Sequence, residues 1–128
     1  MERLTFSPVL GLMKGYLDVL FQHEGRFYVV DWKSNYLGAE LENYQRNLLN
    51  AEMQKAFYVL QYHLYVLATH LHLKMKMPGY VYERDFGGVF YLYLRGIDAK
   101  RGPGYGIFED RPDILLVNAL EEALIPYD

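Results

Sequence analysis

Two short runs rich in Val, Leu, Phe and Tyr, residues 15–22 and 26–33, stand close together near the start of the chain. The residues between them include Glu24-Gly25, and a glycine at this place favours a two-residue β-turn. The pattern therefore predicts a β-hairpin. Residues 34–38 contain Ser, Asn and Gly and are expected to leave the sheet.

A helical period follows from about residue 40 and is strongest over residues 54–74. Apolar residues recur there at spacings of three and four and form two stripes, which predicts a largely buried helix. The first stripe is Phe57, Leu60, Leu64, Leu67 and Leu71, and the second is Val59, Tyr62, Val66 and Leu73. Pro78-Gly79 is expected to end the helix.

The rest of the chain predicts two further strands and a last helix. The run 89–94 is apolar on both faces, which is typical of a central strand covered on both sides. A basic, glycine-rich loop at 98–106 leads to a short strand near 105–108. Asp110 is expected to cap the last helix, with Pro112 in its first turn. The buried face of this helix would consist of Leu115, Leu116, Ala119, Leu120, Ala123 and Leu124.

This order of elements predicts an α/β (α+β) fold with a small mixed β-sheet flanked by helices. The chain has 128 residues, of which 52% are hydrophobic, and is expected to form a single domain over residues 1–128. It has no cysteine, which excludes disulfides and suits a reducing cytoplasm. No apolar run is long enough to span a membrane. The net charge of −3 argues against binding nucleic acid by overall basicity, so such a contact would be local or assisted by a cation.

Three charged residues, Asp18, Asp31 and Lys33, interrupt the apolar pattern of the hairpin. With a two-residue loop at Glu24-Gly25, Asp18 lies directly opposite Asp31. Opposed residues share a face and have Cβ atoms about 4.5 to 5.5 Å apart. Lys33 lies on this face too, because it is two residues beyond Asp31. A loop of odd length would send the two aspartates to opposite faces.

Two carboxylates at this separation repel each other by about 3 kcal/mol at an effective dielectric constant of about 20. Lys33 offsets part of this repulsion, and a divalent cation such as Mg²⁺, with Mn²⁺ as a substitute, offsets it better. Two acids and a lysine also suit metal-dependent hydrolysis of a phosphodiester. The alternative is a solvent-facing hairpin whose charges pair across the strands. The pattern alone leaves both interpretations open.

The hairpin and helix motifs together resemble a known family. GYLDVLFQHEG followed by YVVDWKSNYLG is similar to the C-terminal nuclease domain of RecB proteins, in the PD-(D/E)XK nuclease superfamily. This family has an Asp on the first strand, D-x-K-S-N on the second and Q-x-x-x-Y on the long helix. The matching residues are Asp18, Asp31, Trp32, Lys33, Ser34, Asn35, Gln61 and Tyr65. The resemblance extends from about residue 11 to about residue 124.

The resemblance implies a restriction-endonuclease-like fold and an exodeoxyribonuclease V-type activity, which is Mg²⁺-dependent cleavage of DNA, mainly of single strands. Asp18, Asp31 and the backbone carbonyl of Trp32 would hold the metal, and Lys33 would act on the attacking water. The resemblance also implies a metal-binding histidine on a helix upstream of the first strand, and this chain has no counterpart of it. Its own histidines are interpreted as surface or packing residues: His23, His63, His70 and His72.

The second group of motif residues would position the DNA strand or support the acids: Gln61, Tyr65, Ser34 and Asn35. Gln61 also has an independent interpretation, because it lies in the apolar stripe between Leu60 and Leu64. An amide in such a place is costly unless it is paired. A core glutamine bonded to the end of a strand is therefore the alternative to a role beside the active site.

In this family a helicase precedes the nuclease, so the chain is expected to be part of a larger helicase-nuclease polypeptide that acts in double-strand break repair and recombination. RecC-like and RecD-like subunits, DNA and a bacterial cytoplasm are the implied partners and location. The chain has no G-x-x-x-x-G-K-[ST] motif, so this domain is not expected to bind ATP.

Two alternatives to this function stay open. One is a non-catalytic, nuclease-like docking module that binds partner subunits or DNA. The other is a different nuclease of the superfamily, such as a resolvase or a restriction enzyme. Arg95, Lys100 and Arg101 are interpreted either as phosphate contacts or as a solvated basic loop.

Overall fold

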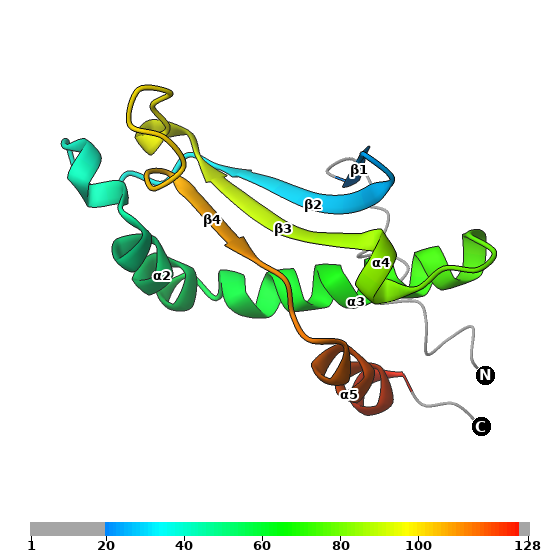
Figure 1. The fold of residues 1–128 in the computed structure, drawn as a ribbon. Helices are drawn as coiled ribbons and strands as arrows, with labels where there is room; N and C mark the ends of the chain where they lie inside the picture. Colours follow the sequence, from blue (N-terminus) through cyan, green and yellow to red (C-terminus); the bar gives the residue numbers. More distant parts are fainter. Residues whose placement is uncertain (1–19, 126–128) are drawn as a thin grey trace.

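The computed structural model describes residues 20–125, and Figure 1 shows helices gathered on one side of a sheet. The strands are β1 (Leu20–His23), β2 (Arg26–Lys33), β3 (Phe86–Tyr93) and β4 (Ile107–Asp110), in the sheet order β1-β2-β3-β4. The helices are α2 (Arg46–Lys55), α3 (Tyr58–Lys76), α4 (Tyr82–Asp85) and α5 (Ile114–Leu124), with 3-10 turns η2 (Leu41–Tyr44) and η3 (Leu94–Gly96). The predicted small mixed sheet flanked by helices is confirmed. Within residues 20–125 no helix is long and apolar enough to cross a membrane.

The hairpin of β1 and β2 has the predicted two-residue loop. Glu24 and Gly25 both have positive φ, 50° and 80°, as a type I′ turn requires. His23 lies opposite Arg26, and Leu20 lies opposite Val29. The register predicted from the turn is therefore confirmed as far as β1 is described.

The pairing of β2 with β3 is parallel and decides which residues of β2 face the helices. Val29, Asp31 and Lys33 are the partners of Val89, Tyr91 and Tyr93, respectively. These three residues of β3 are completely buried. Since paired residues share a face, Asp31 and Lys33 lie on the helix-covered face of the sheet.

β3 is a central strand, as predicted, because β2 and β4 pair with its two sides. Its helix-covered face packs with Val29, Leu49 and Met53 and with residues of α3 in one core. On the opposite face, Phe90 and Leu92 keep part of their surface exposed. Cover of the helix side of β3 is thus confirmed, and cover of the opposite face stays a prediction.

The expected long helix is broken into α2 and α3. Phe57, between them, has a φ of 60° and is 75% exposed. The second predicted stripe is confirmed at Tyr62, Val66 and Leu73, which are buried. The first stripe is wrong at its start, because Phe57 and Leu60 are exposed. An apolar period continues across this break, so the period alone does not reveal it.

The cap and the buried face of α5 also differ from the prediction. Asp113 caps the helix, because its side chain accepts a hydrogen bond from the backbone N–H of Leu115. Asp110 instead ends β4 and accepts a hydrogen bond from the hydroxyl of Tyr62. Val117 is the buried residue of α5, whereas Leu115 is 74% exposed.

His70 is a packing residue, as expected. Only 6% of it is exposed, and its Nδ1 lies 2.9 Å from the hydroxyl of Tyr80. Its ring also packs edge-on against Tyr82. Burial lowers the pKa of His70, and the positive charge of Lys74 lowers it further, against the opposing charges of Glu121 and Glu83.

We expect His70 to make the fold less stable in mild acid. Its pKa is lower in the folded chain than in the unfolded chain, where it is about 6.5, so protons bind the unfolded chain more readily. The stability is therefore fully present above about pH 6.5 and falls as the pH decreases below it. Urea unfolding at pH 7 and pH 5.5 should show a larger loss for the native chain than for His70→Gln. Equal losses would contradict this role.

Candidate active site

Asp31 and Lys33 form an ion pair at the end of β2. Oδ2 of Asp31 lies 3.4 Å from Nζ of Lys33, and the two side chains are 16% and 15% exposed. They meet because residues two apart on a strand point to the same side. The attraction is roughly 5 kcal/mol at an effective dielectric constant of about 20, and desolvation of both charges offsets much of it. Further partners are therefore needed to hold these charges in place.

The ammonium group of Lys33 is enclosed by residues of α3 and β3. Nζ lies 4.1 Å from the ring centre of Tyr58 and 5.3 Å from that of Tyr91. It also donates a hydrogen bond of 3.5 Å to Oε1 of Gln61. An aromatic ring attracts a cation through its negative face. Lys33 is thus held by one carboxylate, one amide and two rings.

Gln61 connects α3 to both strands of the site. Its Oε1 accepts a short hydrogen bond of 2.6 Å from the hydroxyl of Tyr91 as well as the bond from Lys33. Tyr58, Gln61 and Tyr65 are spaced by three and four residues, so they follow one side of the helix. The predicted need for a partner is met, because the amide carbonyl satisfies two donors at once.

The tyrosines around Asp31 stay protonated at neutral pH. Burial raises the pKa of Tyr91 and of Tyr65, and the negative charge of Asp31 raises both further. Burial likewise raises the pKa of Tyr93. Each phenol therefore remains a neutral hydrogen-bond donor.

Asn35 fixes the segment that follows β2 to the helices. Its Nδ2 donates to Oε2 of Glu52 over 2.7 Å and to the hydroxyl of Tyr58 over 3.2 Å. Tyr58 in turn covers Lys33. The described contacts thus run without a gap from Glu52 on α2 to the ion pair.

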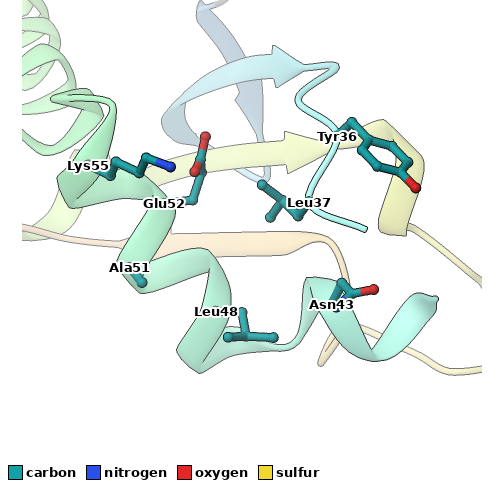
Figure 2. Close-up of a pocket in the computed structure, with 7 residues that line it drawn as sticks. All are labelled: Tyr36, Leu37, Asn43, Leu48, Ala51, Glu52 and Lys55. Carbon is teal, nitrogen blue, oxygen red and sulfur yellow. The ribbon is translucent and has the colours of Figure 1, made fainter. Parts of the chain in front are cut away.

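A cleft of about 330 Å³ opens beside this chain of contacts (Figure 2). It lies between the segment after β2 and the helical segments η2 and α2. Its lining residues are Tyr36, Leu37, Asn43, Leu48, Ala51, Glu52 and Lys55. Glu52 therefore belongs both to the cleft and to the hydrogen bonds that reach the ion pair.

Other predicted residues lie apart from this cluster. The side chain of Trp32 is 58% exposed, and the alternation of β2 directs it to the opposite face of the sheet. Ser34 is exposed, and its backbone carbonyl accepts a hydrogen bond of 2.8 Å from Nε of Arg95. Arg101 pairs with Glu42 of η2 over 2.9 Å, so this ion pair joins the basic loop to η2.

Asp18 lies outside the described residues. Among residues 20–125, no three His, Asp or Glu side chains come together as possible metal ligands. The described part of the site offers one hard oxygen donor of this kind, the carboxylate of Asp31. The described register of β1 and β2 ends at the pair of Leu20 and Val29. The metal site stays a prediction that combines one described acid with one that is not described.

Three residues of the cluster were not predicted from the sequence: Tyr58, Tyr91 and Glu52. Helical spacing could have indicated Tyr58, because it precedes Gln61 by three residues on the same side of the helix. Tyr91 stands in an apolar run and is indistinguishable there from an ordinary core residue. Glu52 reaches Asn35 only through the chain fold, so spacing along the sequence gives no sign of it.

The fold and this cluster define a mixed α/β domain, consistent with a restriction-endonuclease-like domain, with an acid and a lysine at the end of an inner strand. The chain is 45% identical over 119 residues to "RecBCD enzyme subunit RecB" of Escherichia coli and 44% identical over 120 residues to that of Haemophilus influenzae. It is 40% identical over 124 residues to the protein of the same name in Buchnera aphidicola subsp. Schizaphis graminum.

These matches cover 93%, 94% and 97% of the chain, respectively, and the chain spans about 10% of the length of each relative. The chain therefore matches one segment of proteins named RecBCD enzyme subunit RecB, over nearly all of its own length. No family model matches the chain.

We expect Gln61→Leu to lower the free energy of unfolding by about 1 to 3 kcal/mol, because the buried hydroxyl of Tyr91 loses its acceptor. Adding Tyr91→Phe removes that unpaired hydroxyl, so the double variant should lose less stability than the sum of the two single variants. Urea unfolding at pH 7 measures all three losses.

Gln54→Leu is the matched control for this cycle. Gln54 is an exposed glutamine of α2, so its replacement should change stability by less than about 0.5 kcal/mol. If the losses of Gln61→Leu and Tyr91→Phe simply add, the hydrogen bond between them does not contribute as described.

Proposed function

We propose that this chain is a metal-dependent DNA nuclease domain that hydrolyses phosphodiester bonds, mainly in single strands. The observation that carries the proposal is the enclosed pair of Asp31 and Lys33 beside Gln61 of α3. The relatives named RecBCD enzyme subunit RecB support a place in a RecBCD-type helicase-nuclease that acts in DNA repair and recombination.

Lys33 would stabilise the reacting phosphate or orient the attacking water. An ammonium group has three N–H donors, and those toward Asp31 and Gln61 account for two of them. The third is then available for a water or a phosphate oxygen. Because the rings and the acceptors already hold the cation, little reorganisation is needed as negative charge develops on the phosphate.

Asp31 would hold Mg²⁺, or Mn²⁺ in its place, together with Asp18 and the backbone carbonyl of Trp32. When bound, the metal supplies charge that activates water and balances the phosphate. Lys33 already contacts Oδ2 of Asp31, so the metal would share this carboxylate with the lysine. An all-oxygen set of this kind is what these hard cations prefer.

The remaining motif residues divide into two roles. Gln61 and Asn35 support the site, since their side chains bind Lys33, Tyr91, Tyr58 and Glu52. Ser34, which is exposed, and Tyr65, which lies in the field of Asp31, are assigned to positioning the DNA. RecC-like and RecD-like subunits would be the partners of the whole enzyme, in the bacterial cytoplasm.

A second candidate function is a non-catalytic docking module that binds partner subunits or DNA. The exposed leucines of α5 favour it: Leu115 is 74%, Leu116 44% and Leu124 45% exposed. Exposed apolar side chains suit contact with another protein surface. Docking by α5 and chemistry at β2 occupy different parts of the fold.

Cleavage of labelled single-stranded DNA tests the nuclease proposal. With Mg²⁺, we expect Asp31→Ala and Lys33→Gln each to reduce the rate at least about 100-fold, because each removes a charge that acts on the transition state. EDTA should abolish cleavage by the native chain. The control is Glu122→Ala, an exposed acid of α5, which should cleave at the native rate.

The same assay separates the two candidates. Equal rates for the native chain, Asp31→Ala and the sample with EDTA would contradict the nuclease proposal and leave the docking module.

A further inference from the structure

The cleft in Figure 2 adjoins the candidate active site through named contacts. Glu52, in its lining, accepts the hydrogen bond from Asn35, and Asn35 also bonds the hydroxyl of Tyr58. The ring of Tyr58 lies 4.1 Å from Nζ of Lys33. A polymeric substrate that reacts at Lys33 can therefore place its neighbouring unit in the cleft.

The cleft combines apolar surface with an aromatic edge. Tyr36 is 65% exposed and Leu48 is 41% exposed. In Figure 2, Leu37 lies between Tyr36 and Lys55, and Ala51 lies between Leu48 and Lys55. Its volume of about 330 Å³ is at the small end of the range for ligand pockets. A single flat ring system suits such a space, and every nucleobase offers a face that stacks on an aromatic side chain.

Positive charges stand at both ends of the cleft. Lys55 lines one end, and no ion pair is recorded for it within residues 20–125. At the other end, the guanidinium carbon of Arg95 lies 5.7 Å from the ring centre of Tyr36. The one acid in the lining, Glu52, is already engaged by Asn35. Because the whole chain carries a net charge of −3, two cations around an apolar cleft are a local feature.

We propose that this cleft binds one nucleotide of single-stranded DNA, next to the nucleotide whose phosphate lies at Asp31 and Lys33. The base packs against Tyr36 and Leu48, and its two flanking phosphates face Lys55 and Arg95. The inference rests on the proposed function, because the strand must continue to Lys33. A paired duplex does not fit, since the base has to leave its stack to enter the cleft.

Binding of a fluorescent oligothymidine in EDTA, followed by anisotropy, tests the site without cleavage. Tyr36→Ala should raise Kd about 5- to 100-fold, the range found when a stacking aromatic is removed. Tyr36→Phe should keep most of the affinity. Lys55→Gln should lower the slope of log K against log salt by about 0.7, as loss of one phosphate contact on a single strand does.

Matched controls lie on other parts of the fold. Lys76→Gln makes the same charge change at the far end of α3, and Met75→Ala shortens an exposed apolar residue of the same helix turn. Both should bind like the native chain. If Lys76→Gln weakens binding as much as Lys55→Gln does, the contact is general electrostatics and the proposal fails.

Crosslinking locates the strand directly. An oligonucleotide containing 5-iododeoxyuridine, irradiated with the chain in EDTA, should label the peptide that contains Tyr36. Labelling only of peptides without cleft residues, or absence of binding by the native chain, would overturn the proposal. Labelling at Tyr36 together with no cleavage in Mg²⁺ would support the cleft and contradict the nuclease function, so the two failures are distinguishable.

Discussion

The parallel register of β2 and β3 is the constraint on which the candidate site depends. It pairs Asp31 with Tyr91 and turns the ion pair of Asp31 and Lys33 toward α3. A slip of one residue would send these charges to the opposite face and place Trp32 under the helix. Burying two charges on the helix-covered face is tolerable only if α3 supplies partners, and Gln61 and Tyr58 are those partners.

The break between α2 and α3 belongs to the same arrangement. Phe57 has a φ of 60°, which costs a bulky residue roughly 1 to 3 kcal/mol. The next residue, Tyr58, begins α3 with its ring over Lys33 and its hydroxyl bonded to Asn35. A straight continuation of α2 would direct Tyr58 elsewhere. Phe57 is therefore strained at the point where the fold positions Lys33. The cleft borders the same contacts, because Glu52 in its lining accepts the hydrogen bond from Asn35.

The sequence predicts the interactions between residues that are near each other along the chain, and it does not predict most of those between distant residues. The turn at Glu24-Gly25 is local, so the register of the hairpin could be derived from it. Gln61 was identified by its place in a helical stripe and by a family motif. Asp110 was expected to cap α5, but Asp113 caps it, and the hydrogen bond that occupies Asp110 comes from Tyr62, far along the chain. The contacts of Tyr91 and Glu52 are equally distant and leave no local pattern.

The central claim is that the hairpin of β1 and β2 forms a metal site around Asp31. Crystals of the chain soaked with Mn²⁺ and measured at the manganese absorption edge test it most directly. The account predicts an anomalous peak within coordination distance of a carboxylate oxygen of Asp31, about 2 to 2.3 Å, with Asp18 as a second ligand. No peak at Asp31, with its carboxylate bound only by Lys33, would contradict the claim.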